Sequence, residues 1–402
     1  MAVLSTYHLK SSTTMKCKIE TLTPCHIGSG VKLIKDIDFV KSNDHVGILS
    51  SERVYALLGD GGVDKWCNAI ERGESVWSVI KTQHHDARIE DACSRTMVAY
   101  GSVCKELSVQ LSSNGVPYIP GSSIKGAIVS AIVGACREKV KLPSKAKDLK
   151  SVHNIVAEQV LVKPTEKKDG KIVYDPKNSN LRFLRVGDAY FDGVDTVAIE
   201  SYSLNLREKG SIVDKEKAMF VECIDMNCSA TFDLQLRTDL HQVCGNSVLP
   251  LPEVLRSEQS LIAAINSHTL RLLEEELRFW EEQKSRSYYH VDSLEEQDEL
   301  DDYICSIKDV IEHCKKCKEG EEAILRIGYG SGWNFTTGGW IDCDDEEWKK
   351  VLRYARPEPT KRGNSETFLV PSESRYAQYD FPKTRRVGYA PPFGFVKISR
   401  LG

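Results

Sequence analysis

Alternating apolar and polar residues predict β-strands along much of the chain. Between residues 15 and 23, the side chains of Cys17, Ile19 and Thr21 fall on one face and charged residues fall on the other, which is typical of a half-buried strand. Similar runs predict further strands at residues 31–40, 46–49, 105–111, 184–191, 230–236 and 323–327, with a short one near the end, within 387–398.

Apolar residues at a spacing of three and four predict helices between these strands. Ile124, Ile128, Ala131 and Ala135 place a helix from about Ser123 onward. Longer amphipathic patterns predict helices over residues 261–280 and 298–318, and Ser51 is expected to cap a short helix that ends near residue 58.

Strands and helices alternate without a long parallel βαβ series, which favours the α+β class and, within it, two ferredoxin-like (RRM-like) domains. We assign residues 1–240 to the first domain and residues 241–402 to the second. Residues 65–100, which are mixed and mainly helical, and the Lys- and Pro-rich residues 140–180 are expected to be insertions in the first domain. The pair Asp169-Gly170 predicts a hairpin turn in the latter.

Composition sets limits on the class of protein. The 402 residues are 41% hydrophobic, which is enough for two ordinary domains. No run of about 18 apolar residues predicts a membrane-spanning helix, and Met1 to Thr14 lacks the apolar stretch of a signal peptide. The 13 cysteines are scattered, so we expect reduced, mostly buried thiols and a cytoplasmic protein.

The net charge of −4 argues against a non-specific nucleic-acid binder, but the charges are unevenly distributed. Residues 137–185 carry 13 Lys/Arg against 6 Asp/Glu, and residues 350–402 carry 11 against 4, whereas residues 271–302 carry 4 against 12. Local basic surfaces that attract phosphate are therefore compatible with the sequence, although charge runs are more often merely solvated faces.

The most informative motif is Gly121-Ser122-Ser123-Ile124-Lys125-Gly126, at the start of a predicted helix. Small residues allow a ligand close to the backbone, the free N–H groups and the helix dipole favour an anion, and Lys125 adds a positive charge. An RNA phosphate would suit this site. The alternative is an ordinary helix cap with a solvated lysine.

Two glycine-rich segments are further candidates for RNA contact. Gly328, Gly330 and Gly332 follow a predicted strand, and no convincing helix follows them as a dinucleotide-binding fingerprint requires. His26 precedes Gly28, Ser29 and Gly30, where it could stack on RNA or act as a ribonuclease acid or base. For both segments, an ordinary turn is the alternative.

No constellation predicts a metal site or a cofactor. His313, Cys314 and Cys317 lack a second ligand pair at zinc spacing, and His84-His85-Asp86 lacks the flanking ligands of a phosphohydrolase. Asp36 and Asp38 are the carboxylates available to a target-cutting ribonuclease. Both fall in the strand-like run 31–40, which favours a structural role.

Several segments together resemble the RAMP superfamily of CRISPR proteins. They are residues 22–30, 119–127 and 185–189, in the order found in that family. Residues 325–333 and 393–397 resemble the fifth subunit of the type III-A Csm effector complex. Where relatives commonly carry an arginine just after the second segment, this chain has Ile128 and Val129, so one phosphate contact is expected to be lost.

The resemblance implies a non-catalytic, antiviral RNA-binding scaffold that caps the 3′ end of the guide RNA (crRNA) and takes part in its maturation. It implies target RNA, the other Csm subunits (the backbone RAMP subunit above all) and host nucleases as partners. In backbone subunits of the family this place holds a hairpin "thumb", so residues 200–217 are expected to form one that bears Arg207 and Lys209, with Tyr202 and Leu204 as candidate wedges between bases. For this segment, the alternative is an ordinary surface loop. The alternative is a RAMP endoribonuclease that processes guide RNA or cuts target RNA.

Overall fold

The computed structural model describes residues 14–102, 105–141, 149–167, 169–170, 172–205, 213–285, 294–332, 334–340, 384–387 and 392–401. The helices are α1 (Ser51–Leu58), α2 (Gly62–Glu71), α3 (Val76–Gln83), α4 (Ile89–Ala92), α5 (Gly121–Ala135), α6 (Leu149–Leu161), α7 (Thr238–Cys244), α8 (Glu258–Ser285) and α9 (Leu294–Lys316). Within these described residues, no helix is long and apolar enough to span a membrane.

One sheet of five antiparallel strands joins the two ends of the chain. Its order is β11-β15-β1-β18-β16, formed by Leu184–Val186, Ser229–Leu236, Met15–Thr21, Phe395–Arg400 and Glu322–Arg326. In the central strand, Ile19 pairs with Ala230 on one side and with Ile398 on the other. Strands from both predicted domain ranges therefore share this sheet, and the division at residue 240 stays a prediction.

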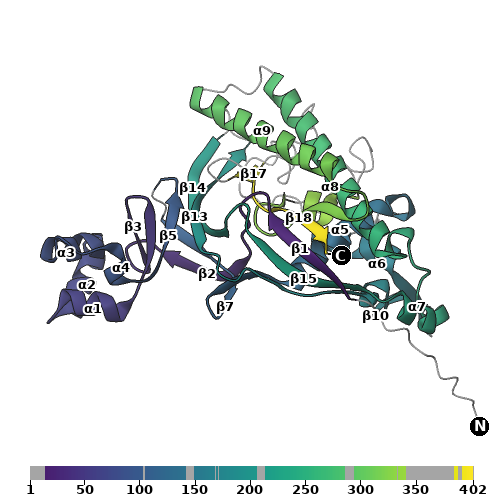
Figure 1. Ribbon diagram of the computed structural model, residues 1–402, viewed down its shortest axis with the longest axis horizontal. Helices are drawn as coiled ribbons and strands as arrows, with labels where there is room; N and C mark the ends of the chain where they lie inside the picture. The colour runs from purple at the N-terminus through teal and green to yellow at the C-terminus, as the bar shows by residue number, and fades with distance from the viewer. Residues whose placement is uncertain are drawn as a thin grey trace, which may run out of the picture.

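The alternation predicted for β1 is confirmed. Cys17, Ile19 and Thr21 are fully buried, whereas Lys16 is exposed. The buried face packs against α5 and α8, for example against Ile124. A second apolar cluster lies between α8 and α9, which run side by side in Figure 1.

A larger sheet of mixed direction curves around a separate core. Its order is β2-β6-β14-β13-β5-β4-β3, formed by Gly28–Ile34, Glu106–Gln110, Val213–Ile224, Thr196–Asn205, Cys93–Tyr100, His45–Leu49 and Phe39–Ser42, with β17 (Thr384–Val387) paired to β13. Phe39, Leu107 and Phe220 meet inside the curve. The helical prediction for residues 65–100 was wrong in its last part, because β5 alternates buried Met97 and Ala99 with exposed neighbours.

The predicted strand 31–40 is interrupted by a turn. β2 ends at Ile34 and β3 begins at Phe39, and Asp36 has a φ of 63°. The Asp38 carboxylate accepts a hydrogen bond from Ile34 N over 2.8 Å, which closes the turn. The expectation that Asp36 and Asp38 lie within a strand was therefore wrong.

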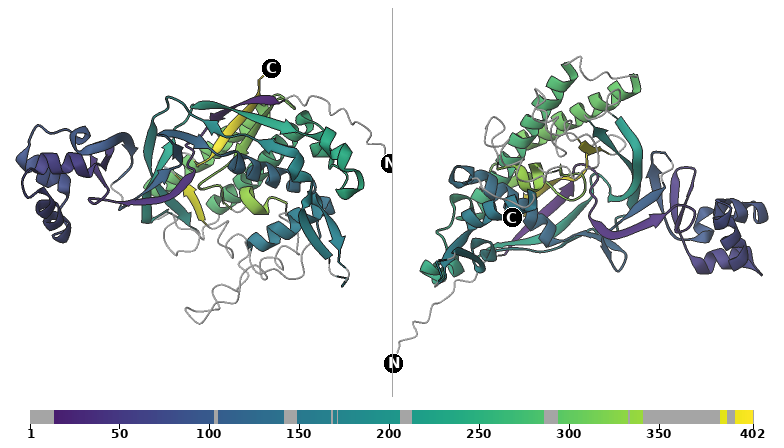
Figure 2. Two further views of the ribbon diagram at one scale, coloured as in Figure 1. Left: turned by 90° about the horizontal axis from the view of Figure 1, so that it is seen from below. Right: turned by 180° about the vertical axis from the view of Figure 1, so that it is seen from behind.

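Two appendages extend from the sheets. Helices α1 to α4 form a lobe that projects from one end of the molecule in all three views (Figures 1 and 2). Asp169-Gly170 lies between β9 (Val162–Glu166) and β10 (Ile172–Ser179), so the predicted hairpin is confirmed. Helix α6 in front of it was not predicted. A small sheet is formed by β12 (Ala189–Tyr190), β8 (Val116–Ile119) and β7 (Ser112–Ser113).

Candidate functional site

Three loops that are far apart in the sequence meet at the junction of the two large sheets. The amide of Tyr329 donates to the His26 carbonyl over 2.9 Å, and the amide of Gly394 donates to the Pro24 carbonyl over 2.9 Å. Ile327 N donates in turn to Gly394 O over 2.8 Å. The predicted segments around His26 and Gly328 are thus brought together, with the closing segment of the chain between them.

Glycine is required where these loops touch. Gly328 has a φ of 75°, and a Cβ added there would collide with the His26 carbonyl oxygen. A Cβ added at Gly394, whose φ is 88°, would likewise collide with the Ile327 carbonyl oxygen. At Gly332, whose φ is 72°, an added Cβ would meet open space. The first two glycines therefore serve the junction, whereas Gly332 and the half-buried Gly330 leave backbone accessible to a ligand.

His26 is an internal residue of this junction, with 2% of its surface exposed. Its Nδ1 lies 2.6 Å from the carbonyl oxygen of Glu222, and its Nε2 lies 3.1 Å from Ser108 Oγ. Burial lowers the pKa of the imidazole, against an opposing effect of the Glu222 carbonyl and charge. In this arrangement both ring nitrogens are used within the protein, and RNA contact by His26 stays a prediction.

The segment after His26 presents its main chain to solvent. Gly28 and Gly30 are exposed, and Gly30 has a φ of 86° with open space where a Cβ would lie. Ser29 Oγ donates to the Val109 carbonyl over 2.9 Å, which fastens the segment to β6. A ligand could therefore approach this backbone without displacing a side chain.

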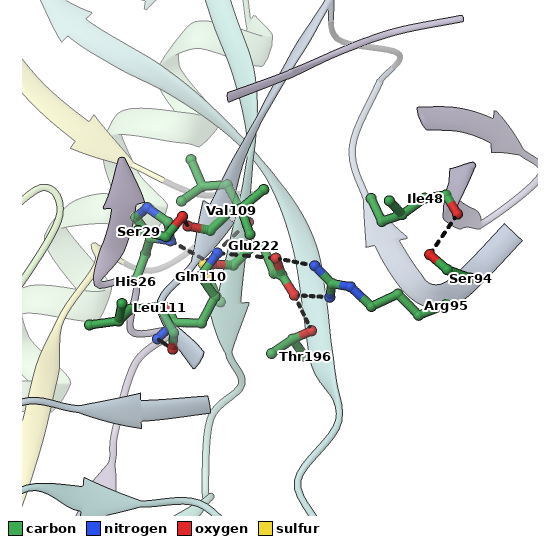
Figure 3. A network of polar contacts seen from close by, with 12 residues as sticks. His26, Ser29, Ile48, Ser94, Arg95, Val109, Gln110, Leu111, Thr196 and Glu222 are labelled. Atoms are coloured by element: carbon green, nitrogen blue, oxygen red, sulfur yellow. Dashed lines mark hydrogen bonds and ion pairs between the residues drawn. The ribbon is translucent and has the colours of Figure 1, made fainter. Parts of the chain in front are cut away.

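Beneath the junction lies a buried carboxylate, that of Glu222, with 2% of the residue exposed (Figure 3). It pairs with the Arg95 guanidinium through both oxygens, and it accepts from Thr196 Oγ1 over 2.6 Å and from Gln110 N over 3.0 Å. Gln110 Oε1 accepts in turn from Ile27 N over 2.9 Å. The network joins β5, β6, β13 and β14 to the loop that carries His26.

Helix α5 begins at the predicted motif, but its lysine points inward. Lys125 Nζ donates to the carbonyls of Leu181 and Leu184 over 2.8 and 2.7 Å, and burial lowers the pKa of the amine. Gly121 N donates to the Asp188 carboxylate over 2.7 Å. Of the predicted phosphate ligands, Ser122 is exposed and Ser123 is half-buried.

The predicted thumb is a β-hairpin at its base. β13 and β14 pair in antiparallel register, with Leu204 opposite Val213. Tyr202 and Leu204 are buried against α8 and α9 and are not available as wedges between bases, so that expectation was wrong. Arg207 and Lys209 lie outside the described residues.

Sequence reasoning missed the residues that hold the junction from below. Arg326 is buried on β16 with its guanidinium 5.0 and 4.6 Å from the ring centres of Phe335 and Phe395, and its Nε donates to the Phe393 carbonyl over 3.1 Å. Tyr329 reaches β13, where its hydroxyl lies 3.0 Å from Ser201 Oγ. The sequence signal that could have identified Arg326 is the presence of an arginine within an otherwise apolar strand.

The described residues contain no group of three His, Cys, Asp or Glu that could hold a metal ion. At the end of α9, burial raises the pKa of the Cys314 thiol to about 12 and that of Cys317 to about 11. Without a metal ion, thiols of this kind stay protonated near neutral pH. The segment Asn334–Gly338 after the glycine loop is a single π-helical turn, unlike the helix of a dinucleotide site.

Comparison with known proteins shows which family and which solved structures this chain resembles. The family model described as the RAMP superfamily matches residues 18–333. No curated protein matches the chain. The crystal structure of T. onnurineus Csm5 superposes with a TM-score of 0.62 at 17% identity, covering 94% of this chain and 99% of that one.

A chain in the cryo-EM structure of the Csm-crRNA-target RNA ternary complex of a type III-A CRISPR-Cas system gives a TM-score of 0.63 at 17% identity, covering 97% of this chain and 100% of that one. At this identity the two likenesses establish a shared α+β fold. Because the family model spans well over half of the sequence, this chain belongs to the RAMP superfamily.

Proposed function

We propose that this chain is a non-catalytic, RNA-binding subunit of a type III-A Csm effector complex that caps the 3′ end of the guide RNA. The observation that carries the proposal is the junction of the Gly28–Gly30 and Gly328–Gly332 segments. Within these segments Gly28, Gly30, Gly328 and Gly332 expose main chain, and Tyr329 contacts Ser201 on β13 of the hairpin, on a fold shared with Csm5 along nearly the whole chain. Exposed backbone N–H groups can bind phosphates without reading sequence.

The topology supports a ferredoxin-like unit within this subunit. The order β11-β15-β1-β18, with α5 and α8 on one face, is that of a βαββαβ unit in which α9 and β16 come between α8 and the last strand. The curved sheet is the candidate for the second RRM-like unit. In this proposal the guide lies over the junction between the two sheets, and the hairpin extends toward the guide–target duplex.

The test is reconstitution with the other subunits encoded beside this chain. The tagged chain should co-purify with the backbone RAMP subunit and with guide RNA of defined 3′ ends. Complexes made without it should carry guides whose 3′ ends are ragged or longer. Recovery of the chain free of Csm subunits and RNA, under conditions where the others assemble, would overturn the proposal.

One observation keeps a RAMP endoribonuclease as a second candidate. Asp36 and Asp38 lie in a turn between strands, and the target-cutting aspartate of backbone RAMP subunits is carried by a loop. Against this reading, the Asp38 carboxylate is committed to Ile34 N, and Lys35 Nζ lies 3.2 Å from the Asp36 carboxylate. Incubating the purified chain with guide precursor or target RNA and Mg²⁺ decides the matter. Cleavage that is lost in Asp36→Ala, Asp38→Ala or His26→Ala would establish the enzyme.

A further inference from the structure

Helix α2 turns an apolar stripe toward solvent. Val63, Trp66, Cys67 and Ile70 are spaced as i, i+3, i+4 and i+7, which places them on one face of the helix. Val63 is 53% exposed and Ile70 is 40% exposed, and Cys67 is also exposed. A surface helix ordinarily directs such a stripe into its own core, so this one is unusual.

The neighbouring helix extends the same surface. Tyr55 on α1 is 40% exposed, and its ring lies against the half-buried Trp66 with the ring centres 5.4 Å apart. Two aromatic rings therefore border the aliphatic stripe. Large aromatic side chains with one exposed side are the residues that most often carry the binding energy of protein interfaces. We call Tyr55, Val63, Trp66 and Ile70 the lobe stripe.

The lobe is not short of a core, so the lobe stripe is not a packing defect. Val54 and Leu58 on α1 are buried together with Val76 and Ile80 on α3 and with Ile89 on α4. This cluster is separate from the core inside the curved sheet. The lobe therefore has an interior of its own, against which one side of Trp66 packs, whereas Val63 and Ile70 lie outside it.

The charge of the lobe argues against RNA and in favour of a basic partner. Residues 51–92 carry eight Asp/Glu against five Lys/Arg. Three of the five cations are engaged with carbonyls of the lobe itself: Lys65 with Leu58, Arg53 with Glu90 and Lys81 with Ala87. The acidic residues Asp60, Asp64, Glu71 and Glu74, all exposed, flank the stripe. Such a surface repels phosphate and attracts a positively charged protein.

We propose that the lobe stripe docks a basic protein subunit of the same ribonucleoprotein complex. The inference rests on the proposed function, because a subunit that lines an RNA carries basic surfaces. The lobe projects from the end of the molecule opposite α7 (Figure 1). A partner can therefore bind the lobe without contacting the helices α8 and α9. The apolar stripe supplies the buried centre of the contact and the acidic flank supplies its polar rim.

The experiment uses the full chain and the reconstituted Csm complex. In the test variant, Val63→Glu is combined with Ile70→Glu, both at exposed positions. The control is Val243→Glu, which alters an equally exposed apolar residue on α7 at the other end of the molecule. We expect the double variant to unfold at the wild-type temperature, to bind guide RNA normally and to lose association with the other subunits on the order of tenfold. The control should associate normally.

Normal association of the double variant would overturn the proposal. The proposal would also be overturned if the wild-type chain forms dimers and the double variant does not. The partner at the lobe stripe would then be a second copy of this chain. If the double variant does not fold, Asp64→Lys combined with Glu71→Lys takes its place, since it reverses the flank and leaves every apolar side chain intact. Unchanged association in that variant overturns the proposal as well. A wild-type chain that fails to join the complex overturns the proposed function itself, which separates the two failures.

Discussion

Nη2 of Arg95 donates to Oε2 of Glu222 over 2.9 Å, and this pair fastens β5 to β14 across the intervening strand β13. The carboxylate is buried, whereas 43% of the arginine side chain is exposed. A buried carboxylate is tolerated only where donors surround it. The ion pair with Arg95 therefore allows the Glu222 carboxylate to stay buried next to the loop of His26. There it accepts hydrogen bonds from Thr196 and Gln110.

Removing the arginine should therefore cost more than a surface ion pair does. In Arg95→Ala, Glu222 stays buried without its cation, and we expect a loss of roughly 2 kcal/mol in the free energy of unfolding, below the range for fully buried pairs because Arg95 is partly exposed. Adding Glu222→Gln should recover part of this loss, since the stranded charge is gone. Urea unfolding of the two single variants and the double variant measures the coupling. Strictly additive losses would contradict it.

Two buried histidines make the fold sensitive to acid. Burial, with Arg271 and Arg137 nearby, lowers the pKa of His268 from 6.5 to about 3, and burial also lowers the pKa of His26. Both are neutral in the folded protein, while the unfolded chain takes up their protons below about pH 6.5. Stability from these groups is therefore complete above pH 6.5 and falls as the pH drops toward the folded-state pKa.

For His268 alone, the linkage predicts a loss of about 2 kcal/mol on going from pH 7 to pH 5. Urea unfolding at the two pH values measures it directly. His268→Gln should lower stability at pH 7 but should reduce the difference between pH 7 and pH 5 by about that amount. A variant whose pH dependence equals that of the wild type would show that His268 does not titrate in this way.

The glycine junction predicts a contrast between two Gly→Ala changes of similar backbone geometry. Gly328→Ala, at a φ of 75°, places a methyl group against the His26 carbonyl, whereas Gly61→Ala, in the left-handed region at a φ of 72°, meets open space in the lobe. Both should cost about 1 kcal/mol for the left-handed backbone. Only Gly328→Ala should separate the loops and release bound guide RNA from the purified complex. Equal RNA retention in the two variants would show that the junction does not serve binding.

The start of α5 separates a structural lysine from an exposed serine. Lys125→Ala leaves the carbonyls of Leu181 and Leu184 without their shared donor, so we expect a loss of about 1–3 kcal/mol. Ser122→Ala should leave stability unchanged and weaken guide binding similarly for every guide sequence, as a phosphate contact would. Thermal unfolding and filter binding with two unrelated guides distinguish these effects. If the Lys125→Ala chain is stable but binds RNA more weakly, Lys125 contacts an RNA phosphate and its role is not structural.

Sequence patterns located the elements of this fold better than the partners of individual side chains. The period-two alternation of β1 and the helical spacing of α5 were sufficient to place both, because one face of each is buried in a single core. Pairing between the first strand and the last could not be read locally. Ile19 and Ile398 are adjacent through long-range register, which no short window contains.

The same limit explains the errors at the candidate site. Lys125 and His26 were predicted to face RNA because their neighbours are small and polar. Their actual partners, the carbonyls of Leu181 and Glu222, come from segments distant in the sequence. The turn at Asp36 was missed because Val31 and Ile34 before it, and Phe39 and Val40 after it, make the whole run strand-like. The meeting of Gly328 with the His26 loop was not predicted, because the two segments are far apart in the sequence.

The hairpin base is held by the helical pair through Tyr202. Its ring is buried among Leu272, Trp280 and Tyr303, and its hydroxyl is hydrogen-bonded to Glu299 on α9. Burial and this carboxylate raise the pKa of the phenol. β17 adds a third strand beside the same residue, with Tyr202 opposite Val387. An isolated two-stranded hairpin is only marginally stable, so these contacts are what fix its base.

Shortening the hairpin should therefore impair function and leave folding intact, whereas weakening its base should destabilise the fold. Replacing residues 206–212 by Asn-Gly keeps the described base, so the chain should unfold near the wild-type temperature, yet it should leave the 3′ segment of the guide open to nuclease if the hairpin covers RNA. Tyr202→Ala removes a buried ring and should cost about 3–5 kcal/mol. Tyr202→Phe, which loses only the bond to Glu299, should cost about 1 kcal/mol. Nuclease footprinting of the assembled complex and thermal unfolding of each chain measure the two properties separately. Full protection of the guide by the shortened chain would show that residues 206–212 form an ordinary surface loop.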